Sequence, residues 1–276
     1  MTLKKLFFIL FFLVNTGAFA QQKPDAVSVS GRYQKKAERR ERINQLIRQE
    51  EEGALIFHKQ SALGFKMNSD GWGTFYEHGK YKTMSNTKLW WLELGEHKHV
   101  KEERVPTVSA SQGFIVMSSY IYGKQNNFFY LNAGLGQQKL IGGKSNKNGV
   151  AVSAIYGGGL SAGLLKPYYL DVQNSTTGKR EFIRYTPENE AVFLDATSIL
   201  GKAGLAKGLK EIKFVPGAHA RAALRFDYGK YNEMISAIEV GLNAAFYSQK
   251  MPILLMNKEK NFFFNAYAAI TFGKRK

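Results

Sequence analysis

The sequence contains no cysteine, few prolines (6) and far fewer acidic than basic residues (22 against 39). Without cysteine the chain forms no disulfide framework, no Cys-ligated metal site and no thiol nucleophile, and it cannot carry a lipoprotein anchor. After the first twenty residues, no stretch offers about 20 uninterrupted apolar residues, the length of a membrane-spanning helix. If the mature chain enters a membrane, it must therefore do so as strands.

The abundant residues are Gly, Phe and Tyr (27, 20 and 14). Together with a negative mean hydropathy, this composition suits a structure that is apolar on one surface only. The formal charge is +17. For an exported chain the natural counter-charges are outer-membrane lipid head groups, lipopolysaccharide or an acidic partner rather than nucleic acid. The open alternative is that lysine-rich loops keep the protein soluble during export.

Residues 1–20 are typical of a Sec signal peptide. Lys4 and Lys5 form the charged region, 6–14 form a short apolar core, and Ala18-Phe19-Ala20 is a small-x-small cleavage site. Cleavage after Ala20 would remove two lysines and leave a charge of about +15 on the mature chain.

Strict alternation of apolar and polar residues marks the last third of the chain. In 217–227 one face is apolar and the other is charged or small, and 234–247 and 262–273 repeat the pattern. These segments have about ten residues or more, as a tilted membrane strand requires, and aromatic residues gather at their ends. The alternation predicts an all-β fold, an antiparallel transmembrane β-barrel, over a soluble sandwich.

Ten candidate strands follow from this pattern, with eight or twelve left open. They start near Ala54, Trp72, Lys88, Gly113, Phe128, Gly149, Leu160, Gly217, Tyr231 and Phe262. Periplasmic turns of bacterial barrels are short and their extracellular loops are longer. The expected turns are 85–86, 123–127, 157–159 and 228–232; the expected loops are 68–71, 100–112, 141–148, 174–216 and 249–261.

Two segments lie outside the predicted barrel of 53–276. Residues 21–52 form a charged periplasmic segment, predicted to be helical from Arg32 to Glu52. This segment either docks on an envelope protein partner, peptidoglycan or the inner leaflet, or is a solvated helix that leads into the barrel. Its basic residues are Arg32, Lys35, Lys36, Arg39, Arg40 and Arg42. The longest loop, 174–216, is expected to contain a helix over 196–210.

Charged residues are expected inside the barrel. Opposite charges in a confined lumen pair, because an unpaired buried charge is very costly. A packed, salt-bridged plug is therefore expected in place of an open pore. The predicted lumen network comprises Lys66, Glu77, Glu93, Asp171, His219, Arg221, Arg225 and Glu239.

No catalytic constellation is evident, and no cofactor or metal is expected. A barrel phospholipase needs a Ser–His pair with an orienting group, and no His-x-Ser arrangement occurs. The only rim candidates for hydrolysis are His97, His99 and Glu102, with Asp70 and Asp171 also expected near the outer strand ends. No third metal ligand accompanies the two histidines.

Four motifs resemble those of a group of small outer-membrane barrel proteins of Bacteroidota. They are Asn68–Gly73, Gly95–Glu102, Gly163–Pro167, and Gly208–Gly217 with the terminal Phe272-Gly273-Lys274. The resemblance covers Gly53–Lys276 and implies location and fold but no mechanism. Val100 stands where the group has proline, which leaves the geometry of that loop open.

The function expected from these features is a non-enzymatic barrel that serves as an envelope structural element or as a subunit of an outer-membrane assembly or secretion complex. The alternatives are a narrow channel for small solutes and an outer-membrane hydrolase with a rim site at His97 and His99.

Overall fold

A computed structural model describes residues 33–41, 44, 57–111, 114–144, 149–174, 178–204, 206–230 and 233–276, with the backbone only at 109–111 and 114–116. The chain divides into two units, Met1–Glu52 and Gly53–Lys276. In the first unit, 33–41 are helical. The signal peptide and its cleavage site lie outside the described residues. No helix in the described ranges has the length and apolar character needed to cross a membrane.

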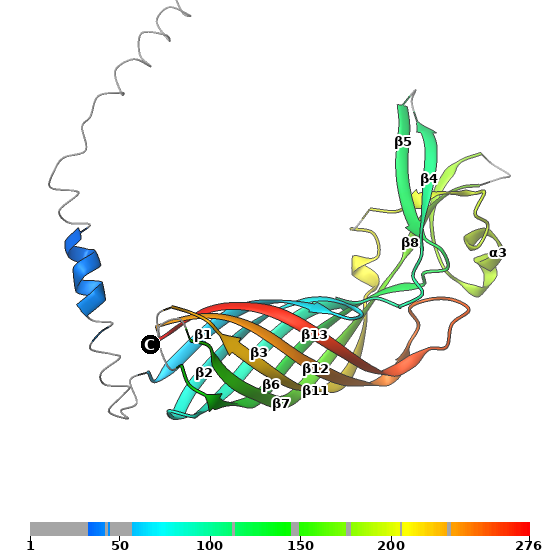
Figure 1. Cartoon of the computed structure of the whole chain (residues 1–276). Helices are drawn as coiled ribbons and strands as arrows, with labels where there is room; N and C mark the ends of the chain where they lie inside the picture. Colours follow the sequence, from blue (N-terminus) through cyan, green and yellow to red (C-terminus); the bar gives the residue numbers. More distant parts are fainter. Residues whose placement is uncertain are drawn as a thin grey trace, which may run out of the picture. The chain divides into compact units, whose positions relative to one another are not determined.

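The second unit is built around a closed antiparallel barrel, which confirms the predicted all-β barrel fold (Figure 1). Pairing of the first barrel strand with the last closes the sheet, in the order β1-β13-β12-β11-β7-β6-β3-β2. The eight strands are β1 (Lys59–Asn68), β2 (Gly71–Thr83), β3 (Asn86–His97), β6 (Asn126–Gly142), β7 (Ala151–Pro167), β11 (Lys213–Asp227), β12 (Met234–Met251) and β13 (Lys260–Arg275).

Side chains alternate between the outer wall and the interior as the sequence pattern requires. On β3, Trp90, Leu92 and Leu94 are 40–47% exposed, whereas the intervening Trp91 and Glu93 are 1% and 2% exposed. The barrel is therefore apolar outside and polar or aromatic inside. This is the reverse of a soluble protein and matches a wall that faces lipid.

The two ends of the barrel differ. Residues 84–85, 143–150 and 228–233 connect strands at one end, where β1 begins and β13 ends; we call this the short-turn end. Residues 69–70, 98–125, 168–212 and 252–259 connect strands at the other, which we call the loop end.

The two longest connections at the loop end fold into a small structured region, here called the head (Figure 1). It contains the hairpin β4 (Arg104–Ser111) and β5 (Phe114–Ile121), and a sheet of β8 (Tyr169–Gln173), β9 (Arg180–Arg184) and β10 (Ile199–Lys202) in the order β10-β8-β9. Three short helices, η1 (Pro187–Asn189), α3 (Glu190–Phe193) and η2 (Leu209–Glu211), complete it. Its core includes Tyr120, Tyr168, Leu170 and Phe193.

The expected count of ten wall strands is corrected to eight, one of the counts left open. The strands expected from Gly149 and Leu160 are one strand, β7, and the strand expected from Gly113 is β5, which pairs only with β4. Residues 157–159 are thus the middle of a strand and not a turn. The backbone of neighbouring strands leaves little room for a Cβ at these glycines, and Gly157 also lies against Trp91; a Cβ on Gly157 would lie 2.4 Å from the Leu135 carbonyl oxygen.

Three other expectations for the connections are also corrected. Residues 123–127 lie at the loop end and 141–148 belong to the short-turn end, whereas the sequence predicts the opposite for both. The reason is that counting β5 as a wall strand reverses the expected direction of the strands that follow, until the division of β7 into two restores it. The helix expected over 196–210 is β10 followed by a turn and η2. Gly201 and Gly208 have φ of 156° and 79°, conformations that a helix does not contain.

Candidate functional site

The interior of the barrel is the most chemically distinctive part of the molecule, and Arg225 is at its centre. Its guanidinium binds Glu77 through two parallel contacts and also donates to Glu239, with Nη2 lying 2.7 Å from Glu77 Oε2 and 2.7 Å from Glu239 Oε2. Both carboxylates are fully buried. Tyr267 donates a hydrogen bond to the second oxygen of Glu239. Such a bidentate arrangement fixes the guanidinium as well as neutralising it.

Arg221 is four residues away on β11, an even spacing, and therefore points into the same lumen. Its Nη2 lies 3.5 Å from Glu77 Oε2, and its guanidinium stacks over Trp91 at 4.0 Å from the ring centroid. Cation–π contacts of this kind strengthen where water is excluded. The indole of Trp91, 1% exposed, thus covers one face of the charge network.

A separate ion pair joins Lys66 to Glu93 at 2.5 Å. Glu93 also accepts a hydrogen bond from the Tyr130 hydroxyl at 2.9 Å, and Asn68 donates to that hydroxyl at 3.1 Å. The central layer of the lumen thus holds three cations and three carboxylates, so its formal charge is balanced. These residues are Lys66, Arg221, Arg225, Glu77, Glu93 and Glu239.

Apolar layers fill the lumen beside this network. One contains Phe75, Leu89, Trp91 and Ile155. A second, nearer the loop end, contains Phe128, Leu165, Val215, Tyr247, Met251 and Ile253, against which Phe263 packs. Because charges and bulky side chains occupy the interior in layers, the lumen resembles a packed core and not an aqueous channel.

A buried Ser–His–Asn group, which the sequence did not reveal, lies beside the charge network. Ser161 Oγ donates to Asn132 Oδ1 at 2.7 Å and lies 3.1 Å from His219 Nδ1, while Trp91 Nε1 lies 3.2 Å from His219 Nε2. Since indole N–H is only a donor, Nε2 must accept, and Nδ1 carries the proton that is donated to Ser161. The chain of hydrogen bonds therefore runs from histidine to serine, opposite to that of a nucleophile and its general base.

One predicted lumen residue, Asp171, is not in the lumen. It lies on β8 in the head and binds Arg180, whose Nε is 2.7 Å from Asp171 Oδ1. This expectation is wrong because the strand containing Asp171 leaves the barrel wall after Pro167. The structure brings the other seven predicted residues together inside the barrel.

The predicted rim residues divide between two environments. His97 is 4% exposed, its Nδ1 lies 2.8 Å from Asp70 Oδ2, and its ring packs against Phe128, Tyr130 and Phe263. This histidine is not a solvated surface group. Within the described residues, no serine or threonine hydroxyl is hydrogen-bonded to it, so the Asp70–His97 pair has no nucleophile beside it.

His99 belongs instead to the loop that follows β3. Its backbone N–H donates to Glu102 Oε1 at 3.0 Å, and its Nδ1 accepts from the Lys101 N–H at 3.2 Å. Glu102 is held by Lys124 at 2.9 Å. Partial burial and the nearby charge of Lys260 lower the pKa of His99 below its usual value. Glu102 therefore organises the loop.

No cluster suited to a metal ion is found in the described parts of the chain. Four of the predicted basic residues, Lys35, Lys36, Arg39 and Arg40, are exposed on the helix of 33–41. Arg32 and Arg42 lie outside the described residues, and the docking role of this segment stays a prediction.

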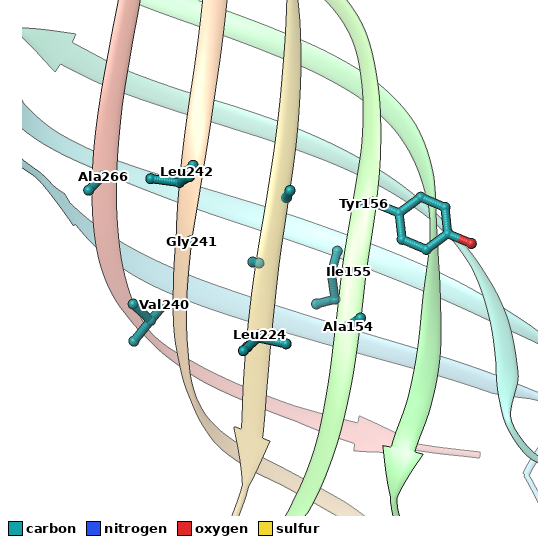
Figure 2. A pocket seen from close by; sticks show the side chains of 10 residues that line it. Ala154, Ile155, Tyr156, Leu224, Val240, Gly241, Leu242 and Ala266 are labelled. Carbon is teal, nitrogen blue, oxygen red and sulfur yellow. The ribbon is translucent and has the colours of Figure 1, made fainter.

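A shallow depression of about 500 Å³ lies on the outer wall across β7, β11, β12 and β13 (Figure 2). Its lining includes the small residues Ala154, Ala222 and Ala266 and larger ones such as Leu224 and Leu242. Tyr156 supplies the only side-chain polar atom among its lining residues. Apart from the Tyr156 hydroxyl, its lining has no side chain that could act as an acid, base or nucleophile, and the depression is part of the apolar wall.

Comparison with known proteins gives weak similarities only. No family model matches the sequence, and no curated protein is similar to it. Among solved structures, Neisserial surface protein A is similar with a TM-score of 0.38 and 8% identity over 80% of this chain and 97% of that one. Ail, the attachment invasion locus protein of Yersinia pestis, gives 0.34 and 9% over 80% and 100%. The N-terminal β-barrel domain of Pseudomonas aeruginosa OprF gives 0.32 and 11% over 78% and 96%.

Proposed function

We propose that this protein is an integral outer-membrane barrel whose filled lumen conducts nothing and whose wall anchors the head at the membrane surface. Its role would be structural, as an element of the envelope or as a subunit of an outer-membrane assembly or secretion complex. The observation that carries the proposal is an apolar outer wall around an interior of buried, charge-balanced ion pairs.

The height of the apolar wall supports membrane insertion. On β13 the outward positions run from Phe262 to Phe272 with no charge between them, a span of ten residues. At about 3.4 Å per residue this is about 34 Å along the strand, and a tilt of about 40° reduces it to about 26 Å. An apolar band of about 25 Å is typical of outer-membrane barrels. We therefore propose export through the predicted signal peptide and placement of the short-turn end in the periplasm.

The filled interior argues against the channel alternative. Planar-bilayer recordings of the refolded chain are expected to show a flat trace, and to remain flat when Arg221 and Arg225 are replaced by alanine, because the aromatic layers still close the lumen. Regular conductance steps from the unmodified protein would refute a closed barrel. Hydrolysis is tested by His97→Ala and His99→Ala, since lipid or peptide cleavage lost in both would restore the rim-site alternative.

The head offers a surface for a protein partner. Val108 on β4 and Met117 on β5 are directly opposite each other in the hairpin and are 68% and 79% exposed. Val100 and Met256, in neighbouring loops, are 91% and 80% exposed. The opposed side chains of Val108 and Met117 form a local exposed apolar surface, which is typical of interaction sites.

Pull-down from gently solubilised envelopes tests the assembly role. A defined partner should co-purify with the unmodified protein and be lost in the double variant Val108→Glu/Met117→Glu. Met84→Glu is the matched control, because Met84 is an exposed apolar residue (40%) in a turn at the opposite end. A clean monomer with no partner in any sample would count against the assembly role and leave the structural one.

A further inference from the structure

Outward-facing lysines form a row across the barrel wall at the short-turn end. Lys59 on β1 is directly opposite Lys80 on β2, and Lys80 is directly opposite Lys88 on β3. All three are exposed. Lys82 and Lys139 extend the same outward face on β2 and β6. We call Lys59, Lys80 and Lys88 the lysine row.

The lysine row is unfavourable without a counter-anion. Directly opposed residues on neighbouring strands have Cβ atoms about 5 Å apart, and like charges at that spacing destabilise a sheet. No carboxylate among the described residues forms an ion pair with any of the three. These exposed lysines therefore lie at the outer surface of the wall without an ion-pair partner in the described part of the chain.

An aromatic group on the same strands indicates where the lysine row lies relative to the membrane boundary. Trp90 lies opposite His78 and packs edge-on against Tyr76, with ring centroids 5.7 Å apart. Aromatic residues of this kind mark the boundary between hydrocarbon and head groups. Lys80 and Lys88 are each two residues further out, about 7 Å along the strand, and so stand in the head-group layer.

We infer that the lysine row binds the phosphate groups of anionic glycerophospholipids in the leaflet at the short-turn end. A lipid there would place its phosphate at the lysines and its acyl chains on the apolar wall below, against Trp90, Leu92 and Phe65. The lysines, the aromatic group and the apolar wall adjoin one another, so a lipid can contact all three. A free phosphate would contact only the lysines. This inference rests on the proposed membrane insertion and adds a lipid preference to it.

Quenching of Trp90 fluorescence by brominated lipid tests the inference. The full chain carrying Trp72→Phe leaves Trp90 as the one outward tryptophan, since Trp91 is buried in the lumen. It is refolded into mixed vesicles of phosphatidylcholine and phosphatidylglycerol, with either lipid brominated in turn. The ratio of the two quenching curves gives the relative affinity for the anionic lipid beside Trp90.

The unmodified row should prefer phosphatidylglycerol by at least about fivefold, with the preference decreasing in high salt. Lys59→Gln/Lys80→Gln/Lys88→Gln should bring the ratio close to 1. The matched control, Lys202→Gln/Lys207→Gln/Lys210→Gln, removes the same charge from the head and should retain the preference. Equal quenching by both lipids in the unmodified protein would overturn the inferred lipid preference but not membrane insertion. A loss of preference in the control as large as that in the lysine-row variant would do the same. No quenching by either lipid would refute membrane insertion itself.

Discussion

Removal of the Arg225 guanidinium is expected to destabilise the barrel strongly. The variant Arg225→Met keeps much of the side-chain volume but leaves Glu77 and Glu239 as buried carboxylates without their main partner. Breaking a buried ion pair in this way costs about 3–5 kcal/mol. Because one arginine serves two carboxylates, we expect a loss in the upper part of that range. The remaining contacts of Arg221 with Glu77 and of Tyr267 with Glu239 keep the loss from being larger.

The assay is equilibrium unfolding in guanidinium chloride with the protein in lipid vesicles, followed by tryptophan fluorescence. The triple variant Glu77→Gln/Arg225→Met/Glu239→Gln removes all three charges and should recover most of the loss, to within about 2 kcal/mol of the unmodified protein. Arg184→Met is the matched control, because the Arg184–Glu211 pair in the head is about half exposed and should matter by less than about 1 kcal/mol. If Arg225→Met lowers the free energy of unfolding by less than about 1 kcal/mol, or if the triple variant recovers no stability, the assignment of a buried network is refuted.

Three other perturbations follow from the same structure. Leu92→Arg places a charge midway up the outer wall and should lower stability in vesicles by about 2–4 kcal/mol, whereas Leu92→Phe should be near neutral. Gly134→Ala would place a Cβ 2.3 Å from the Trp91 ring and should cost about 1–3 kcal/mol in the same unfolding assay, with partial rescue by Trp91→Phe; equal stability would contradict the close packing. Lys260→Gln should raise the pKa of His99, which histidine NMR in micelles would detect as a titration midpoint at higher pH; an unchanged midpoint would dismiss the contribution of Lys260.

The wall of the barrel could be predicted from the sequence, because period-two alternation is a local signal. It held on β11, β12 and β13, where most outward apolar residues are followed by an inward polar or small one; exceptions such as Val215, Ile235 and Phe263 lie near the strand ends. The inward set followed directly, since Arg221, Arg225 and Glu239 occupy the second face of strands already recognised. Asp171 failed because alternation continues into the head after Pro167 and does not show where a strand leaves the wall.

The strand count could not be obtained by the same means. Gly157, Gly158 and Gly159 have the composition of a turn, but the backbone of neighbouring strands requires their small size, and at Gly157 so does the Trp91 ring on another strand. The β4–β5 hairpin added a second surplus strand, because its residues favour strands without belonging to the wall. The two errors preserved the overall parity of turns and loops, so this check could not expose them.

The Ser161–His219–Asn132 group shows a different limit. These residues come from β7, β11 and β6, and their proximity depends on the register of three strands. Neither their spacing in the sequence nor their types distinguish them from scattered polar residues. The absence of a His-x-Ser motif therefore said nothing about this contact, and the direction of its hydrogen bonds decides its role.

The central claim, a lipid-facing wall around a closed lumen, is tested most directly by cysteine accessibility on β13. The chain has no cysteine of its own, so Ala268→Cys on the outer face and Ala269→Cys on the inner face each introduce a single thiol. In intact vesicles, Cys at position 268 should react with a lipid-dissolved maleimide and resist a water-soluble methanethiosulfonate, while Cys at position 269 should resist both until denaturant is added. Val100→Cys, in an exposed loop, should react at once with the water-soluble reagent. Water-soluble labelling at 269 would show an open lumen, and at 268 a wall that does not face lipid.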